Sequence, residues 1–156
     1  MQCTECRPEH PEFTRMTSRL FELHCDHSRA VLRATLRDHW PVEEVARFER
    51  AIRDALSHLN RRSGSPARYA LLIDARLHGV QSRDVVERLQ AVSAAIMGEV
   101  ACIAVIVTSA LHKRQADRIN PDSLHRVFDR EDNATEWIAQ RRAPRRPVAA
   151  GSAMRA

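Results

Sequence analysis

The sequence predicts an α/β domain with a mostly parallel sheet that begins with an antiparallel hairpin. Two segments near the N-terminus alternate apolar and polar residues, as strands covered on one face do. Two later segments, 69–74 and 102–108, are continuous apolar runs typical of strands covered on both faces. Amphipathic helical patterns separate the later strands, so the expected order is β-β-α-β-α-β-α-β-α.

The N-terminal hairpin is predicted from segments 21–25 and 32–36, in which every second residue is apolar. Residues 26–29, Asp-His-Ser-Arg, make a plausible polar turn between the two strands. Residues 1–19 show no sustained periodicity and are predicted to be a flexible lead-in. The domain is therefore expected to begin at residue 20.

The first helix has the clearest amphipathic pattern in the chain. Pro41 suits a first helical position, and Glu43 and Glu44 suit the positive end of the helix dipole. The apolar residues recur at steps of three and four: Val45, Phe48, Ile52, Leu56 and Leu59. Gly64 and Pro66 are expected to end this helix.

Three more helical patterns follow the central strands. Their apolar faces contain Val85, Val86, Leu89, Val92 and Ile96; then Leu111, Ala116 and Ile119; then Ala134, Trp137 and Ile138. Gly98 and Asn120-Pro121 are expected to end the first two, and residues 126–129 to form a short last strand. The predicted domain spans residues 20–140, and residues 141–156, with two prolines and no core pattern, are predicted to be a disordered basic tail.

The net charge of +5 is concentrated in this tail, whose arginines are Arg141, Arg142, Arg145, Arg146 and Arg155. The 25 basic residues less these five leave 20, which balance the 20 acidic residues. The basic character of the chain therefore says little about the partner of the folded part. No apolar run reaches 18 residues and no secretory pattern opens the sequence, so we expect a cytoplasmic protein without membrane insertion.

The motifs of several enzyme classes are missing. Loops that bind the phosphate groups of nucleotides require clustered glycines, and the glycines of this chain are not clustered. Asp74, His78 and Ser82 share one loop, but no nucleophile-elbow motif accompanies them. An Asp at a central strand's end also occurs in response-regulator receiver domains, yet the acidic pair and the lysine of that chemistry are missing. We therefore predict a protein that is not an enzyme and has no cofactor.

The cysteines give one weak indication of a metal. Cys3 and Cys6, with His10, have the spacing of half a zinc knuckle, but a structural zinc needs four ligands. The commoner interpretation of this pattern is a flexible tail that carries two thiols and binds no metal, so no metal is expected. Cys25 and Cys102 lie in predicted strands and are expected to be small buried residues.

Ser82 stands where the N-cap of the second helix is expected. As a cap, its hydroxyl would accept an N–H from the first turn and stabilise the helix by about 1 kcal/mol. As a phosphosite, it would place a dianion at the positive helix end, next to Arg83. Capping is the commoner of these two roles.

The order of elements, the strand YALLID with its polar loop and Ser82-capped helix, and the ending RVFDREDNATEWI together resemble the STAS superfamily. This is the SpoIIAA-like fold of bacterial anti-sigma-factor antagonists, and the resemblance covers residues 20–140. In those antagonists, a serine in the loop after the central strand is phosphorylated and switches partner binding. The resemblance aligns Val80-Gln81-Ser82-Arg83 with that motif. Ser82 matches the serine, whereas Gln81 and Arg83 depart from the motif.

We therefore expect a non-enzymatic regulatory or scaffolding module that acts by protein–protein contact with a partner that the sequence does not identify. The expected contact surface comprises Asp74, Arg76, His78, Gln81, Ser82 and Arg83. The alternative is a small-ligand or lipid-binding module of the same fold, with an apolar pocket under the second helix. Specific nucleic-acid binding is disfavoured, because the folded part is neutral and only 4% of the residues are aromatic.

Overall fold

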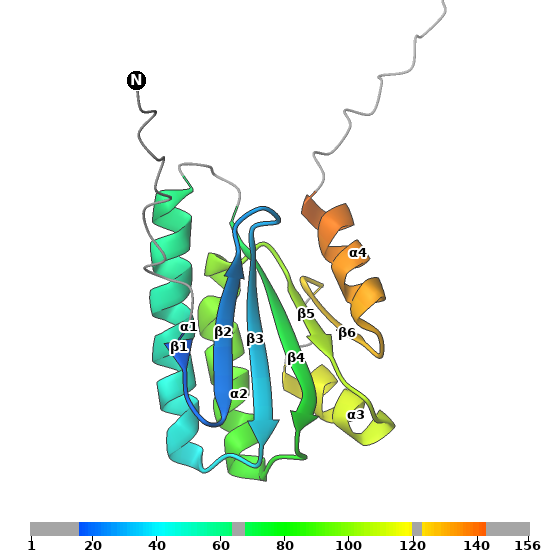
Figure 1. Cartoon of the computed structure of the whole chain (residues 1–156). Coiled ribbons are helices and arrows are strands. Elements are labelled where there is room, and N and C mark those ends of the chain that lie inside the picture. Colours follow the sequence, from blue (N-terminus) through cyan, green and yellow to red (C-terminus); the bar gives the residue numbers. More distant parts are fainter. Residues whose placement is uncertain (1–15, 64–67, 120–122, 143–156) are drawn as a thin grey trace, which may run out of the picture.

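The computed structural model describes residues 16–63, 68–119 and 123–142 (Figure 1). Its strands are β1 (Met16–Thr17), β2 (Phe21–Asp26), β3 (Val31–Asp38), β4 (Ala70–His78), β5 (Ile103–Ile106) and β6 (His125–Phe128). Its helices are α1 (Val42–Arg62), α2 (Arg83–Ile96), the short 3₁₀ helix η1 (Met97–Glu99), α3 (Ala110–Ile119) and α4 (Glu131–Arg142). After the short strand β1, the elements follow the predicted order.

The strands form one sheet in the order β1-β2-β3-β4-β5-β6. The pairs β1–β2 and β2–β3 are antiparallel, and the three later pairs are parallel. The predicted mixed sheet with its N-terminal hairpin is therefore confirmed.

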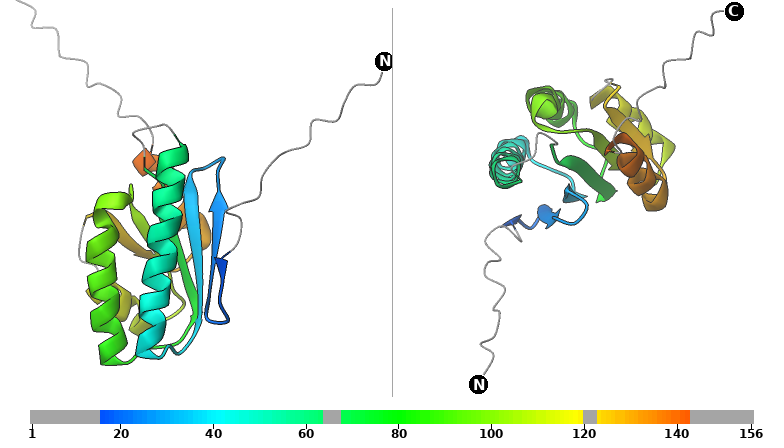
Figure 2. Two further views of the ribbon diagram at one scale, coloured as in Figure 1. Left: turned by 90° about the vertical axis from the view of Figure 1, so that its left-hand side faces the viewer. Right: turned by 90° about the horizontal axis from the view of Figure 1, so that it is seen from above.

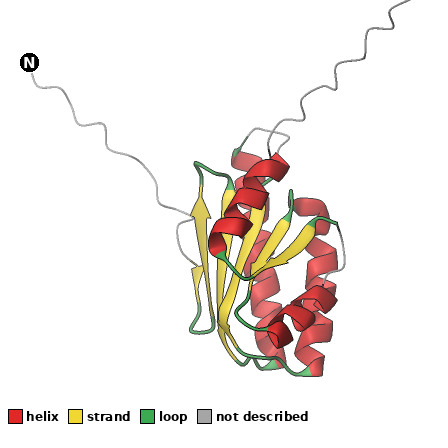
Figure 3. Cartoon of the chain, turned by 90° about the vertical axis from the view of Figure 1, so that its right-hand side faces the viewer, coloured by secondary structure: helices red, strands yellow, loops and turns green. Residues whose placement is uncertain are grey.

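Helices cover both faces of this sheet. Consecutive parallel strands are neighbours, and right-handed crossovers then place the connecting helices α1, α2 and α3 on one face. The last helix, α4, is not a crossover, and it packs on the opposite face, as the view from above shows (Figure 2). α3 lies at the end of the sheet where β4 and β5 terminate, and α4 runs back toward the other end (Figures 1 and 3).

Each face has its own apolar core. The larger core joins the sheet to α1 and α2, and its most deeply buried members include Leu23, Ile52, Leu56, Leu71 and Ile103. The smaller core joins α4 to β4 and β5 through Ala70, Leu72, Cys102, Ala104, Ile106, Ala134, Trp137 and Ile138. Burial of one Leu or Ile side chain stabilises the fold by about 2 kcal/mol. Because both faces of β4 and β5 are covered, their sequences are continuous apolar runs.

The two cysteines of the described residues are buried thiols, as predicted. Burial raises the pKa of Cys25 and of Cys102 to about 11. Both are therefore protonated at neutral pH and unreactive. Cys3, Cys6 and His10, the half zinc knuckle, lie outside the described residues.

Helix ends follow the sequence signals closely. Pro41 is the N-cap of α1 rather than its first residue, with Glu43 and Glu44 in the first turn. Ser82 is the N-cap of α2, as predicted. The residues expected to end the first and third helices, Gly64, Pro66 and Asn120-Pro121, lie outside the described residues.

The folded part extends beyond both predicted boundaries. β1 lies within the predicted lead-in and pairs with β2. α4 continues to Arg142, whose guanidinium donates to the carbonyl oxygens of Ala30 and Arg68. Arg141 lies 5.1 Å above the centroid of the Trp137 ring. Arg142, which was assigned to the tail, thus holds α4 to the segments that flank β3 and β4, whereas residues 143–156 are outside the described part. Among the residues that the structure describes, no helix is long and apolar enough to cross a membrane.

A β-bulge in β4 changes which way the end of this strand faces. Thr35 of β3 pairs with Asp74, and Arg37 pairs with Leu77, so two steps along β3 match three along β4. The extra residue reverses the alternation of side chains. His78 therefore faces the α1/α2 side, together with Leu71, Ile73 and Ala75. In a regular strand, it would lie on the same face as Asp74.

Candidate functional site at the carboxyl end of β4

On the α4 face of β4, Asp74 lies in a cluster of four charged side chains. Arg33 donates from Nη2 to Oδ2 of Asp74 at 2.6 Å. Arg76 donates from Nε and Nη2 to the two Asp74 oxygens at 2.9 and 2.7 Å. Both arginines also bind Glu131, in the first turn of α4, at 2.5 and 2.9 Å. The cluster is formally neutral and ties β3, β4 and α4 together.

The arginines keep both carboxylates of this cluster ionised. Burial alone would raise the pKa of Asp74, but the hydrogen bonds from Arg76 and Arg33 outweigh it and hold that pKa below its usual range. The hydrogen bond from Arg33 likewise lowers the pKa of Glu131. A carboxylate with a lowered pKa is a weak base, so the geometry suits Asp74 to holding the fold rather than to proton transfer.

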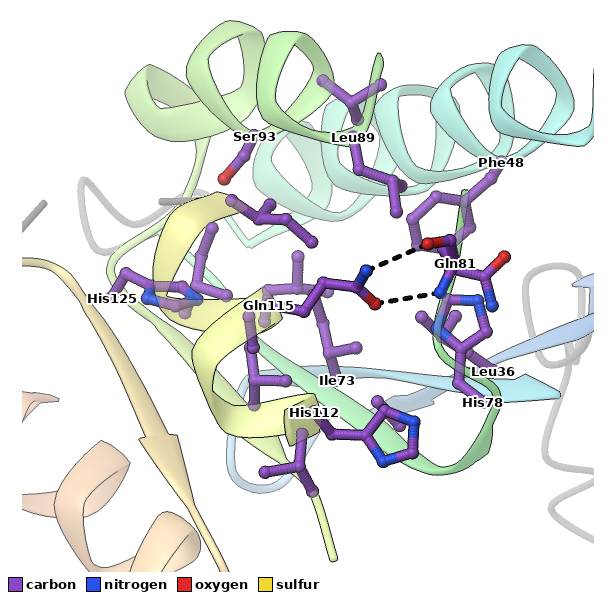
Figure 4. Close-up of a pocket in the computed structure, with 18 of the residues that line it drawn as sticks. Leu36, Phe48, Ile73, His78, Gln81, Leu89, Ser93, His112, Gln115 and His125 are labelled. Carbon is purple, nitrogen blue, oxygen red and sulfur yellow. Dashed lines mark hydrogen bonds between the residues drawn. The ribbon is translucent and has the colours of Figure 1, made fainter. Parts of the chain in front are cut away.

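On the opposite face, His78 lines a cavity of about 80 Å³ between the sheet, α2 and α3 (Figure 4). Most of the lining is Leu, Ile and Val; the polar side chains are His78, Gln81, Ser93, His112, Gln115 and His125. The His78 ring is 8% exposed, with its centroid 4.9 Å from that of Trp40. Burial lowers the pKa of His78 to about 4, with smaller contributions from His112 and His39. The imidazole is therefore neutral at pH 7.

Because Asp74 and His78 lie on opposite faces of the sheet, they form no relay with Ser82. The hydrolase arrangement that one shared loop suggested is thus not assembled. In the part of the chain that the structure describes, no group of three His, Cys, Asp or Glu side chains could hold a metal ion.

The loop between β4 and α2 is anchored by Gln81. Its side-chain oxygen accepts a hydrogen bond from the backbone N–H of Trp40 at 2.8 Å. Its Nε2 donates to the backbone carbonyls of Asp38 and Gly79 at 3.0 and 2.6 Å. Its backbone N–H donates to Oε1 of Gln115 at 3.0 Å, and Nε2 of Gln115 donates to the Gln81 carbonyl at 3.1 Å (Figure 4). The buried Gln81 side chain therefore joins the loop to the end of β3, and its backbone joins the loop to α3.

Gly79 lets a second side chain hold the same loop. The His39 ring lies so close that a Cβ on Gly79 would be 2.5 Å from its Cε1 atom. Nδ1 of His39 lies 2.9 Å from the Val80 carbonyl, to which it donates. The approach of His39 thus requires a residue without a side chain at position 79.

Beyond Gln81 the loop reaches solvent. Ser82 is exposed, and its Oγ accepts the Val85 N–H at 3.4 Å, a long hydrogen bond for a cap. Arg83 is fully exposed and pairs with Glu87, one turn along α2, at 2.7 Å. Neither side chain is needed for core packing, so both are available to a partner.

Three large apolar side chains are exposed at this edge: Leu77 at 66%, Val80 at 38% and Leu111 at 60%. Leu77 is the penultimate residue of β4, and Val80 lies in the loop two residues after the strand. Leu111 lies one turn before Gln115 on the same side of α3, and Gln115 is bonded to the residue after Val80. We call Leu77, Val80 and Leu111 the apolar edge patch.

The predicted contact surface is only partly exposed. Asp74, His78 and Gln81 are buried, which corrects their assignment to a surface: each is turned inward by the sheet or by loop hydrogen bonds. Arg76 is partly exposed but belongs to the charged cluster, while Ser82 and Arg83 are exposed as expected. Sequence reasoning missed the apolar edge patch. Its signal was present as two large apolar residues, Leu77 and Val80, in a loop taken to be polar.

The comparisons with known proteins support the fold. No protein-family model and no curated protein matches the chain. Among solved structures, it is similar to an uncharacterised protein of the DUF3478 family from Shewanella loihica, described as having a SpoIIAA-like fold. The two are 18% identical, with a TM-score of 0.56 over 79% of this chain and 98% of the other. The chain therefore has the SpoIIAA-like fold that the sequence resemblance predicted.

Proposed function

We propose that this chain is a non-enzymatic, cytoplasmic module that regulates or scaffolds through protein–protein contact at the apolar edge patch. One observation carries this proposal: among the described residues, the large apolar side chains that are exposed all lie at this edge. Exposed apolar side chains that are gathered in one region with a polar rim are typical of interaction sites, whereas single ones are common on any surface. The SpoIIAA-like fold supports it, because the anti-sigma-factor antagonists that the sequence resembles use the corresponding loop.

Ser82 is the proposed switch on the rim of the patch. A phosphate there would add close to two negative charges at the positive end of α2, where the helix dipole favours an anion. The serine is exposed and its present hydrogen bond is long, so modification would disturb little of the fold. The charge of the rim would change, and with it the affinity for a partner.

The test is to recover the partner from the native host with the full chain as bait, then to measure affinities. Leu77→Ser with Leu111→Ser should weaken binding at least tenfold, because both removed side chains lie in the patch. The matched control is Ala94→Ser with Ala95→Ser, two exposed changes on α2 that should leave affinity unchanged. Equal affinity of the two double variants would refute the proposed surface.

The switch is tested separately from the patch. Ser82→Asp should alter affinity while Ser57→Asp, the same change at an exposed serine on α1, should not. Arg83→Ala probes the adjacent positive charge. Intact-mass measurement of protein from the native host then shows whether a phosphate is present on the chain.

A second candidate function, small-ligand binding, is favoured by the cavity under α2 (Figure 4). The sequence alternative also included a lipid, but the cavity is much smaller than a lipid requires. A cavity of about 150 Å³ accepts a molecule the size of benzene, so a cavity of about 80 Å³ has no room for an acyl chain. Native mass spectrometry of freshly purified protein would detect a bound small molecule, and a lipid adduct would contradict this size limit.

A further inference from the structure

Two imidazole nitrogens at the cavity lack a hydrogen-bond partner among the described residues: Nε2 of His78 and Nε2 of His112. The other nitrogen of His112, Nδ1, lies 3.0 Å from Oγ of Ser109, so only its Nε2 is left over. Buried polar atoms are paired in most proteins, and an unpaired one is destabilising. A ligand group in the cavity that reached both nitrogens would satisfy both rings.

The position of His78 follows from the bulge in β4. Without the extra residue between Asp74 and Leu77, the ring would lie on the α4 face, next to the charged cluster. Bulges recur beside functional sites, where they redirect a side chain. Here the bulge directs a neutral, hydrogen-bonding ring into a cavity whose lining is mostly aliphatic. Trp40 packs on the ring and fixes its place.

The lining also restricts the charge of a ligand. It contains no Asp, Glu, Lys or Arg, and the His78 ring is neutral. A charged molecule would lose hydration and would meet no carboxylate, ammonium or guanidinium group in this lining, which is unfavourable. The ligand must therefore be uncharged.

The volume restricts its size. A cavity of about 150 Å³ accepts benzene, with six carbon atoms, so about 80 Å³ has room for about three to four non-hydrogen atoms. Most of these atoms would contact Leu, Ile and Val side chains and should be carbon.

We propose that the cavity between the sheet, α2 and α3 binds a small uncharged molecule with an aliphatic body and one hydroxyl or carbonyl group held by His78 and His112. The proposal rests on the second candidate function, a small-ligand site, and gives that site a ligand class. It is independent of the apolar edge patch.

Three probes of the same shape test both the existence of the small-ligand site and the proposed ligand class. The probes are 2-propanol, isobutane and isopropylammonium, which differ only in carrying a hydroxyl, a methyl or an ammonium group. Each is titrated into the full chain while NMR follows the histidine ring nitrogens and the methyl groups of Leu, Ile and Val. Binding will be weak because the probes are small. We expect saturable shifts with 2-propanol, about tenfold weaker binding of isobutane, and none of isopropylammonium.

Variants assign the hydrogen bond. In His78→Leu, 2-propanol should lose its advantage over isobutane, whereas His24→Leu, a change at an exposed histidine of β2, should leave it intact. If His78→Leu does not fold, His112→Leu tests the second ring in the same way. Absence of saturable shifts with 2-propanol and isobutane would overturn both the ligand class and the small-ligand site. Isobutane or isopropylammonium binding as tightly as 2-propanol would keep the site and refute the class.

Discussion

Asp74 and His78 lie four residues apart on β4, and both are buried, yet their polar groups have opposite surroundings. Asp74 faces α4, and two arginines satisfy its carboxylate. His78 faces the cavity, and its Nε2 has no partner among the described residues. The bulge between them sends the two side chains to opposite faces. One strand end thus carries a fully paired charge on one face and an unpaired neutral ring on the other.

The difference indicates which face is built for stability and which for binding. An ion cluster around a buried carboxylate contributes little net stability, but removing one member leaves uncompensated charge and is destabilising. Such a cluster fixes one arrangement of β3, β4 and α4. An unpaired neutral ring destabilises only modestly and leaves a polar contact open for a ligand. The predictions below test this division, from the largest effect to the smallest.

Asp74→Ala should destabilise the protein by about 3 kcal/mol, because Arg33 and Arg76 would then share only the partly exposed Glu131. Urea denaturation followed by circular dichroism measures the free energy of unfolding. The matched control is Asp54→Ala, at an exposed position of α1, which should change stability by less than about 0.5 kcal/mol. Similar effects of the two changes would mean that the cluster does not hold the fold.

The second prediction concerns pH. The pKa of His78 is lowered from 6.5 to about 4, so the folded state binds this proton less readily than the unfolded state. The stability that the neutral ring contributes is complete above pH 6.5 and is lost as the pH falls toward 4. Between pH 7.5 and 5 the loss should be about 2 kcal/mol. Asp74, whose pKa is also lowered, stays ionised in this window and loses its contribution only at lower pH.

Denaturation curves at pH 7.5, 6 and 5 separate the two residues. The variant His78→Leu should lose most of the pH dependence over this range, while His24→Leu should keep it. A wild-type protein equally stable at pH 7.5 and pH 5 would show that His78 takes up a proton without penalty. The contrast with Asp74 would then be wrong.

The contrast also shows what the sequence could and could not predict. The central strand and the helix capped by Ser82 were predicted correctly, because both depend on local patterns: an apolar run and an N-cap residue. The predicted strand end at Asp74 was wrong, since β4 continues to His78. The burial of His78 was not predictable in this way. It depends on the register between β3 and β4, which is set by residues about 40 positions apart in the sequence.

The partners of the buried polar residues were missed for the same reason. Arg33 reaches Asp74 from β3, and Glu131 of α4 binds the two arginines that hold Asp74. No local motif marks either residue. Gln81 belonged to a loop that looked free of packing, yet it bonds to the end of β3 and to α3. Local sequence therefore located the central strand and the start of α2, whereas long-range pairing decided where the strand ends and which of its residues face solvent.

Gly79 directly follows His78, and the change Gly79→Ala should destabilise the protein by about 1 kcal/mol. The added Cβ would displace the His39 ring, which is exposed and can move away, at the cost of its bond to the Val80 carbonyl. Gly98→Ala is the matched control, because nothing lies within 4 Å of a Cβ there. The double change Gly79→Ala with His39→Ala should cost no more than His39→Ala alone; a clearly larger cost would place the strain elsewhere.

The smallest effect is expected at the exposed end of the loop. Ser82→Ala should cost about 0.5 kcal/mol, near the lower limit for an N-cap, because the bond from Val85 N–H to Ser82 Oγ is long. Ser57→Ala, inside α1, should be neutral or slightly stabilising, since Ala is the better helix former. Thermal melts of the two variants beside Gly79→Ala measure the order. If Ser82→Ala proves the most damaging, the loop is held by its exposed cap and not by Gln81 and His39. Ser82 would then be a structural residue whose modification unfolds the start of α2, which is incompatible with a switch that leaves the fold intact.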